Sequence, residues 1–557
     1  MIYKAELFLV DFSVSALNFF LDFSRAVLFG KPKPSPRKIL IYKIGNIGDI
    51  VCAVPALIAI RKFYPDAKIT LLTSPGAKGG LGAKELLEGA SYIDELKVYY
   101  SEDIGSFGKK NSFVKQLRSA KYDLFIQLPD DIVSFGTLLR NMIFAKIIKA
   151  KSAFGFKIRT IQLFKKAQVD YASQETEPES LADLLRENGV KIDRIEYDFN
   201  VSDKEKENAR EFISEKWPDY KKELIIAISP GGKRDGNRWP VEKFAGLAEY
   251  LENKHRAKII ILGGRGDLDK AGTIGLAVKS DNILIAAGKL SLLETYELLK
   301  SCSFLVSNST GTIHLAAAAG APAVGFYGIR DVQGRWFPYG DKNIILCHQF
   351  FGCGYKDEKC VEKSVKNIGI NEAFSACDNM MKIIGRAGKG EKIFAEDKVV
   401  FLDRDGVINK KMPEGDYVKN WDEFQFLPGV FEGLKILKST GYRIFIITNQ
   451  RGIAKGVMKE SGLLEIHDRM KKELEKQNIF IDGIYYCPHG KDGGCDCRKP
   501  KPGMFLKAAE GFGLDLSKAI FVGDSESDKI AGKAANIRTI IKGGELGLLK
   551  AARLITK

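Results

Sequence analysis

The sequence predicts an α/β protein made of several units, each built on a parallel sheet. At 557 residues the chain is too long for one hydrophobic core, so we expect three or four domains. From residue 38 onward, apolar segments of strand length alternate with segments of helical periodicity. Such alternation is typical of parallel sheets covered by helices on both faces. The expected strands are 38–44, 68–72, 95–99, 123–127, 224–229, 258–262, 282–286, 304–307, 323–327, 399–402, 443–447 and 519–522.

Composition narrows the class of protein further. Hydrophobic residues at 45% and charged residues at 28% exclude a disordered chain, a collagen-like fibre and a polytopic membrane protein. The net charge of +16 favours anionic partners such as phosphates. That charge is dispersed along the chain and no nucleic-acid motif occurs, so we expect no nucleic-acid partner. The odd number of cysteines, nine, indicates metal binding in a reducing compartment, hence a cytoplasmic protein.

The first thirty residues are rich in Phe, Leu and Val but are interrupted by charges. Their longest uncharged run, Phe12 to Leu21, is far below the roughly 18 residues that a spanning helix needs. We therefore expect neither a transmembrane helix nor a signal peptide. Two interpretations stay open: a helix packed on the protein body, or an interfacial helix on the cytoplasmic face of the inner membrane. The expected domains are 1–37 (this helix and a Pro-rich linker), 38–210 and 211–385 (two α/β domains), 386–397 (a linker) and 398–557 (a third α/β domain).

The third α/β domain carries the sharpest chemical pattern. Its first strand ends in Asp403-Arg404-Asp405-Gly406, and residues i and i+2 of an extended segment share a face. Two such carboxylates suit a nucleophile beside an acid/base that is held protonated more easily. Asp403, the backbone carbonyl of Asp405 and Asp524 would form an oxygen site suited to Mg²⁺.

Two further features at this edge suit phosphate. Thr448 and Asn449 end another strand and can hold phosphate oxygens. Lys499 or Lys501 can neutralise a transferring phosphoryl group.

Four segments carry a family resemblance: LDRDGVIN at 402–409, TNQRGIAKG at 448–456, YYCPH at 485–489 and CDCRKPKPG at 495–503. They resemble the haloacid dehalogenase (HAD) superfamily and, within it, the D,D-heptose 1,7-bisphosphate 7-phosphatases. The resemblance covers residues 398 to 542, effectively the whole domain. Histidinol-phosphate phosphatases share most of these motifs, so that substrate class is the alternative.

The resemblance implies roles for particular residues. An aspartyl-phosphate would form on Asp403, with Asp405 protonating the sugar oxygen on C7 of a heptose 1,7-bisphosphate as that oxygen leaves phosphorus. Lys499 would bind phosphate, and Arg498 would help choose which end of the bisphosphate enters. Arg451 stands where relatives usually have a small residue, which changes the mouth of the site. The implied phosphate- and substrate-binding set is Asn409, Thr448, Asn449, Arg451, Arg498 and Lys499.

Cysteine and histidine pairs in the same domain predict a metal site. Cys487-x-His489 and Cys495-x-Cys497 supply four ligands that suit tetrahedral Zn²⁺, and four protein ligands indicate a structural role. Free buried thiols are the alternative. A second metal site could be formed by Cys347, His348, Cys353 and Cys360, but their spacing is irregular and contains no paired motif.

The first two α/β domains each contain glycine-bearing helix entrances. The turn before Asp49 lies between a strand and a helix; the simplest role of this carboxylate is a helix N-cap. In the second domain, the segments 229–234 and 309–312 each follow a strand, and the latter opens a helix. Both suit a diphosphate, because backbone donors and the helix dipole favour anions.

Together these segments resemble glycosyltransferase family nine, the ADP-heptose:lipopolysaccharide heptosyltransferases, over residues 38 to 384. The resemblance implies a GT-B fold of two Rossmann-like domains and an inverting transfer that needs no metal. Asp49 would be the general base, and Asp267 or Asp269 would hold the ribose. Two positions depart from the family pattern, Asn237 in place of Lys and Ser309 in place of Asp. The implied nucleotide-sugar set is Lys233, Arg234, Arg238, Asp267, Thr310, Gly311 and His314.

The sequence therefore predicts a fused enzyme of heptose and lipopolysaccharide core synthesis. Its expected partners are heptose bisphosphate, a nucleotide-activated heptose such as ADP-heptose, an LPS core/lipid A acceptor and peripherally the inner membrane. Its expected cofactors are Mg²⁺ for the phosphatase and structural Zn²⁺. The alternatives are a histidinol-phosphate-type phosphatase fused to a transferase for another sugar, or to a non-catalytic nucleotide-sugar sensor.

Overall fold

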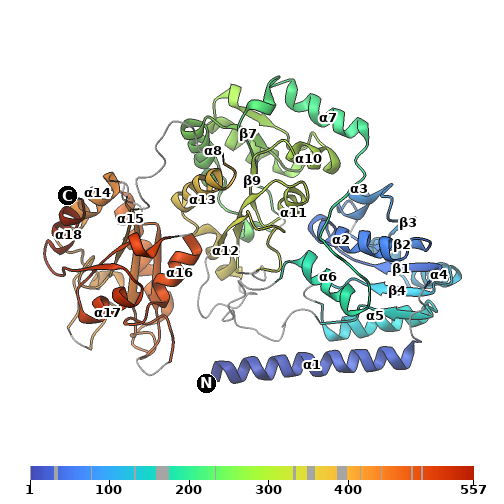
Figure 1. Ribbon diagram of the computed structural model, residues 1–557, viewed down its shortest axis with the longest axis horizontal. Helices are drawn as coiled ribbons and strands as arrows, with labels where there is room; N and C mark the ends of the chain where they lie inside the picture. The colour runs from blue at the N-terminus through green and yellow to red at the C-terminus, as the bar shows by residue number, and fades with distance from the viewer. Residues whose placement is uncertain are drawn as a thin grey trace. The chain divides into compact units, whose positions relative to one another are not determined.

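The computed structural model divides into two compact units, Met1–Arg386 and Ala387–Lys557, which are described separately (Figure 1). It describes the whole chain except residues 1, 30–34, 77, 131–132, 159–174, 233, 330–333, 348–357, 386–397, 414, 441, 478, 480, 491–493, 513 and 557. Three sequence-based predictions lie outside these described residues: Lys233, the second Cys/His site with His348 and Cys353, and the linker 386–397.

The first sheet has five parallel strands in the order β3-β2-β1-β4-β5. Its three central strands are largely apolar and almost fully buried, because helices cover both faces of a parallel sheet. The strands are β1 Lys38–Tyr42, β2 Lys68–Thr73, β3 Glu95–Val98, β4 Leu124–Gln127 and β5 Ser152–Phe154; the helices are α2 Ile47–Phe63, α3 Ala83–Leu87, α4 Phe107–Ser119, α5 Phe135–Ile147 and α6 Glu177–Glu187.

The second sheet, in the same unit, has six parallel strands in the order β11-β10-β9-β6-β7-β8. One hydrophobic cluster contains residues of both sheets, so the two halves of this unit share a core. The strands are β6 Ile225–Ser229, β7 Lys258–Ile261, β8 Ile283–Ile285, β9 Phe304–Asn308, β10 Ala323–Tyr327 and β11 Ile344–Cys347; the helices are α7 Asp203–Ser214, α8 Val241–His255, α9 Leu268–Ala277, α10 Leu292–Leu299, α11 Gly311–Ala318, α12 Glu358–Lys366 and α13 Ile370–Ile383.

The second unit contains one five-stranded parallel sheet in the order β14-β13-β12-β15-β16. The central strand β12 pairs with β13 and β15, so the loops that follow these three strands leave the sheet side by side. The strands are β12 Val399–Leu402, β13 Arg443–Asn449, β14 Gly483–Cys487, β15 Ile520–Gly523 and β16 Arg538–Ile541; the helices are α14 Val430–Ser439, α15 Glu460–Glu475, α16 Gly503–Phe512, α17 Glu526–Ala534 and α18 Gly547–Ile555.

The N-terminal segment is a helix, α1 (Ile2–Leu28), that packs along α5 (Figure 1). Leu21 is fully buried in the cluster that α1 shares with the first sheet, so the packed-helix interpretation is confirmed for one side of α1. Within the described residues, no helix combines the length and the apolar character needed to cross a membrane.

Each expected strand is confirmed, with ends that differ by at most two residues. Four strands were not expected: β5, β11, β14 and β16. All four lie at a sheet edge, where a strand has a neighbour on one side only and its apolar signal is weaker. The three parallel sheets confirm the predicted α/β class.

Candidate active sites

The carboxyl edge of the third sheet brings together two acids and a lysine that are far apart in sequence. Lys499 Nζ lies 2.9 Å from Asp403 Oδ2 and 2.7 Å from Asp528 Oδ1, and all three side chains are nearly buried. Burial raises the pKa of Asp403 to about 7, with Lys499 opposing this rise and Asp528 adding to it. Burial alone would lower the pKa of Lys499, but the two carboxylates raise it above its ordinary value. The lysine therefore stays charged beside Asp403.

The second acid of the motif, Asp405, is held by three donors. Arg404 Nη2 contacts both carboxylate oxygens of Asp405 at 2.9 and 3.0 Å, Asn409 Nδ2 donates at 3.0 Å and Gln450 Nε2 at 2.8 Å. Burial alone would raise the pKa of Asp405, but Arg404 and these hydrogen bonds lower it below its ordinary value. Asp403, not Asp405, thus has the raised pKa, the reverse of the order expected from the sequence, because the buried Arg404 faces Asp405.

Three carboxylates at this edge are placed to hold a divalent cation. One oxygen from each of Asp403, Asp524 and Asp528 lies within 4.8 Å of the others. Asp524 Oδ1 is buried and has no hydrogen-bond partner among the described residues, which fits an oxygen ligand of a hard cation. The expected Mg²⁺ set contained Asp405 through its backbone carbonyl; the structure adds the carboxylate of Asp528 to Asp403 and Asp524.

A glycine makes this arrangement possible. Gly406 has a φ of +92°, a backbone conformation that residues with a side chain rarely adopt. A Cβ at Gly406 would lie 2.2 Å from Asp524 Oδ2. The turn after Asp405 can therefore approach Asp524 only because residue 406 lacks a side chain.

The two candidate lysines have different surroundings. Lys501 Nζ pairs with Asp496 at 2.9 Å on the surface, whereas Lys499 contacts Asp403. Asn449 holds the Lys499 main chain: Oδ1 accepts from Lys499 N at 3.1 Å and Nδ2 donates to Lys499 O at 3.0 Å. Of the two lysines, the geometry therefore favours Lys499, with Asn449 positioning it.

The remaining expected phosphate-site residues are spread around this lysine. Thr448 is buried, and its hydroxyl accepts a hydrogen bond from Gln450 at 3.0 Å. Arg451 Nε is buried without a hydrogen-bond partner among the described residues. Arg498 Nη1 donates to the carbonyl of His489 at 3.3 Å, which ties the residue before Lys499 to the Cys/His cluster.

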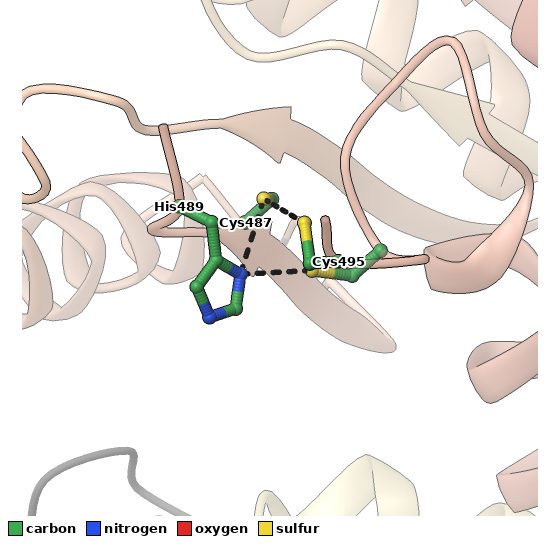
Figure 2. Close-up of side chains that lie close together, drawn as sticks. Cys487, His489 and Cys495 are labelled. Atoms are coloured by element: carbon green, nitrogen blue, oxygen red, sulfur yellow. Dashed lines mark hydrogen bonds between the residues drawn. The ribbon is translucent and has the colours of Figure 1, made fainter. Parts of the chain in front are cut away.

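Figure 2 shows that the predicted zinc ligands converge. His489 Nδ1 lies 3.6 Å from Cys487 Sγ and 3.3 Å from Cys497 Sγ, and Cys495 Sγ lies 3.7 Å from Cys487 Sγ. All four ligand atoms fall within 4.8 Å of one another. The pKa of Cys487 is lowered to about 5, first by a hydrogen bond from Cys497, which favours a thiolate. Three thiols and one imidazole in this space fit a tetrahedral Zn²⁺.

In the first unit, Asp49 lies in the first turn of α2 and in a buried charged cluster. The N-cap of α2 is Asn46 rather than Asp49; Asp49 is the third helical residue of a capping box, and its Oδ2 accepts from Asn46 N at 2.8 Å. Burial raises the pKa of Asp49, with the nearby Lys43 opposing the rise and Asp130 adding to it. Lys43 is fully buried, and its Nζ lies 2.8 Å from Asp130 Oδ1. A carboxylate with a raised pKa beside a fixed cation suits proton transfer.

The N-termini of α2 and α11 meet at two glycines. A Cβ at Gly311 would lie 2.8 Å from Ile47 Cβ, and one at Gly48 would lie 3.2 Å from His314 Cδ2. His314 Nδ1 lies 3.4 Å from Cys52 Sγ, and burial lowers the pKa of His314 to about 4, so the imidazole is neutral. The expected acceptor-side and donor-side residues therefore lie on adjoining helix N-termini.

Asn308, which the sequence reasoning missed as a site residue, ties the donor-side loops together. Its Oδ1 accepts from Trp239 N at 2.9 Å, and its Nδ2 donates to the carbonyls of Pro230 and Gly231 at 2.9 and 3.0 Å. A Cβ at Gly231 would lie 2.6 Å from Asp267 Oδ2, so Asp267 is close to the 229–234 loop.

In the described structure, the guanidinium of Arg238 is bonded to groups of its own loop. Its Nε donates to the carbonyl of Gly232 at 2.8 Å, and its guanidinium pairs with Asp235. Arg234 and Thr310 immediately precede the short helix Asp235–Asn237 and helix α11. At one of the two departures from the family pattern, Asn237 Oδ1 is buried without a hydrogen-bond partner among the described residues.

Comparison with known proteins assigns each unit. A family model described as glycosyltransferase family 9 (heptosyltransferase) matches residues 111–366, and one described as haloacid dehalogenase-like hydrolase matches residues 356–536. The D-glycero-alpha-D-manno-heptose-1,7-bisphosphate 7-phosphatase of Campylobacter jejuni is 49% identical over 144 residues, 26% of this chain and 81% of that protein. The chain belongs to this family of haloacid dehalogenase-like phosphatases.

Two further relatives support this division of the chain. The D-glycero-beta-D-manno-heptose-1,7-bisphosphate 7-phosphatase of Pasteurella multocida is 40% identical over 166 residues, 29% of this chain and 85% of that protein. A solved glycosyltransferase family 9 structure from Veillonella parvula is 20% identical, covers 62% of this chain and 97% of its own, and has a TM-score of 0.51. The expected fold of the first unit is thereby confirmed, so a heptosyltransferase-like unit is fused to the phosphatase unit.

Several residues of the phosphatase-family site were not in the expected set. Asp528 carried a visible signal, since Ser525 and Asp528 form a capping box at the start of α17 that directs this carboxylate to the sheet edge. Gln450 and Lys411 carried none: Lys411 Nζ reaches Asp524 Oδ2 at 2.7 Å from a loop distant in sequence.

Gly406→Ala should remove the phosphatase activity while a matched change does not. Its Cβ would displace Asp524, so we expect turnover to fall by about 10²-fold or more, the scale of a misplaced catalytic group. Gly415→Ala is the control, because Gly415 also has a positive φ (+94°) but nothing within 4 Å of its Cβ. Turnover on a sugar phosphate and the free energy of unfolding measure the two effects. Equal losses in both variants would contradict the steric argument.

Proposed function

We propose that the second unit hydrolyses the C7 phosphate of D-glycero-D-manno-heptose 1,7-bisphosphate, and that the first unit transfers heptose from a nucleotide-heptose to an LPS core acceptor. The observation that carries the first half is the buried cluster of Asp403, Lys499 and Asp528, in a unit that is 49% identical to a heptose-bisphosphate phosphatase. The second half is supported by the position of Asp49 beside the N-terminus of α11, in a unit matched by the heptosyltransferase family model.

The proposed phosphatase reaction has two steps. A carboxylate oxygen of Asp403 attacks phosphorus, the bond from phosphorus to the sugar oxygen breaks, and Asp405 donates a proton to that oxygen. Asp405 must therefore gain a proton when substrate binds, which requires its hydrogen bonds to Arg404 to loosen. In the second step Asp405 takes a proton from water, which attacks the acyl phosphate and releases phosphate and free Asp403.

Lys499, and the backbone that Asn449 holds, would neutralise the negative charge of the transferring phosphoryl group. Asp403, Asp524 and Asp528 would hold Mg²⁺, which would supply positive charge to the phosphate oxygens and favour the ionised form of Asp403. Thr448, Asn409, Arg451 and Arg498 would complete the substrate contacts.

The proposed zinc site is structural. Four protein ligands leave no open position for substrate, and the cluster precedes Arg498 and Lys499 directly. Its role would be to fix the loop that carries the phosphate-binding lysine.

In the proposed transfer, Asp49 accepts the proton of the acceptor hydroxyl as that oxygen attacks the anomeric carbon and the nucleotide diphosphate leaves. Lys233, Arg234 and Arg238 would neutralise the diphosphate, and Asp267 would hold the ribose. ADP-heptose and an LPS core/lipid A acceptor are the proposed partners, in a cytoplasmic reaction that needs no metal. Asn237 and Ser309 are the reasons to keep a non-catalytic nucleotide-sugar sensor as the competing role of this unit.

Two substitutions separate the proposed chemistries. Asp403→Asn keeps the shape of the side chain but removes the nucleophile, so phosphatase turnover should fall by about 10³-fold or more. Asp49→Asn should lower glycosyl transfer by about 10²–10⁴-fold with donor affinity nearly unchanged. Each variant should keep the other activity, measured as phosphate release and as acceptor glycosylation. Normal transfer by Asp49→Asn would remove the general-base role, and donor binding without any turnover in the unaltered protein would favour the sensor.

Zinc removal should act on one unit alone. The purified protein should contain about one tightly held Zn²⁺ per chain, and Cys495→Ser should lose it and destabilise the phosphatase unit, because metal binding contributes folding free energy. Cys302→Ala, a buried cysteine of the first unit, is the control that should keep the metal. Metal content and separate thermal transitions measure both. A stoichiometric metal that survives in Cys495→Ser would contradict the ligand set.

A substrate comparison tests the proposed sugar. The alpha and beta anomers of heptose 1,7-bisphosphate should both exceed histidinol phosphate in kcat/KM, and the greater identity to the alpha-named relative leads us to expect a preference for the alpha anomer. Phosphate release under identical Mg²⁺ concentrations is the measurement. A higher kcat/KM for histidinol phosphate would replace the heptose assignment with the alternative phosphatase class.

A further inference from the structure

Helix α1 exposes a continuous row of large apolar side chains, which we call the α1 apolar face. Phe19, Phe20, Phe23 and Val27 are exposed to 74, 50, 60 and 69%. Phe19, Phe23 and Val27 are four residues apart, so they follow one line along the helix. Contiguous exposed apolar side chains of this size mark an interaction site, whereas single ones do not.

The opposite side of α1 is already used for packing. Leu21 is fully buried, and Val14, Leu17 and Leu28 contact the same hydrophobic cluster as α5. Asn18 fixes the rotation of the helix, since its side chain donates to the carbonyl of Ile158 at 3.1 Å and accepts from the amide of Ile158 at 2.8 Å. The α1 apolar face therefore cannot turn inward without breaking these contacts, and α1 is apolar on both sides while only one is covered.

The neighbouring helix, α5, adds further exposed apolar side chains and also positive charge. On α5, Ile143 and Ile147 are exposed, and Phe135 places its ring 5.8 Å from that of Phe20. Between residues 135 and 150 the chain carries three basic residues and no acidic one: Arg140, Lys146 and Lys149. Helix α1 contains three acids, Glu6, Asp11 and Asp22; in the stretch that carries the α1 apolar face the acid is Asp22, which lies 3.7 Å from Arg25. The apolar surface is thus bordered by net positive charge, which complements an anionic surface.

We propose that the α1 apolar face lies flat in the interface of an anionic phospholipid bilayer. The phenylalanines would enter the boundary between headgroups and acyl chains, while Arg140 and Lys146 of α5, and Lys149 just after it, face the lipid phosphates. The helix would lie on the membrane rather than cross it. This goes beyond the chemistry proposed for either unit, because it assigns a binding surface to a helix that carries no catalytic residue. A second copy of the chain is the competing occupant.

The test uses the full-length protein and vesicles of phosphatidylethanolamine with 30% phosphatidylglycerol. The unaltered protein should sediment with these vesicles, less at high salt and less with phosphatidylcholine alone. Phe19→Glu/Phe23→Glu should lower the partition coefficient by at least about 10-fold. Two aromatic side chains that would insert into the bilayer are replaced by negative charges, which the anionic lipid repels. Leu276→Glu is the matched control, since Leu276 is an exposed leucine on α9 of the same unit, and its partitioning should be unchanged.

Two measurements keep the outcome unambiguous. Phosphatase turnover and circular dichroism should be unchanged in the double variant, and Phe19→Ser/Phe23→Ser replaces it if they are not. No sedimentation of the unaltered protein, equal sedimentation of the double variant, or an equal loss with Leu276→Glu would overturn the proposal. So would a dimer in vesicle-free sedimentation that the double variant abolishes, because a second copy would then cover the face. The vesicles contain no sugar acceptor, so this result is independent of the proposed transfer.

Discussion

Parallel strands of one sheet all end on the same edge, and this constraint brings together the acids of the proposed phosphatase site. In the phosphatase unit, Asp403, Thr448 and Asp524 stand at or just beyond the ends of β12, β13 and β15, which are adjacent in the sheet. Charges that meet in this way are removed from water, so they must be compensated locally. Lys499 does this by lying between Asp403 and Asp528, and its own backbone is fixed by Asn449.

The same requirement explains the contacts of a second buried charge, Arg404, which follows Asp403 in the sequence. Its side chain is fully buried, and its guanidinium contacts both Asp405 and the imidazole of His467. The distance from Arg404 Nη1 to His467 Nε2 is 3.2 Å. Burial and the charge of Arg404 lower the pKa of His467 well below its ordinary value, so His467 is neutral and can accept from Arg404. The orientation of Asp405 therefore depends, through Arg404, on a buried histidine more than sixty positions away in the sequence.

Most of the fold could be predicted from the sequence, because buried parallel strands are apolar runs that alternate with segments of helical periodicity. The strands that were missed, such as β5 and β16, are short and stand at sheet edges, where the apolar signal is weak. The Cys/His cluster and the position of Asp403 could be predicted because each belongs to a short local pattern. Lys411, Gln450 and Asn308 could not, since their contacts depend on how separate loops meet, which local spacing does not encode.

The donor side of the heptosyltransferase-like unit shows how a departure from a family pattern can leave the architecture intact. Asn308 joins the Pro230–Gly231 loop to Trp239 with three hydrogen bonds, and Ser309 continues from it with its amide bonded to the carbonyl of Phe326. None of these contacts uses the Ser309 side chain, so the loop does not need an aspartate to keep its shape. An aspartate at residue 309 would add a negative charge, but the loop does not need it to keep its shape. In the proposed transfer, the exchange to serine would therefore bear on how the donor is held and how fast it reacts, and not on whether this half of the unit folds.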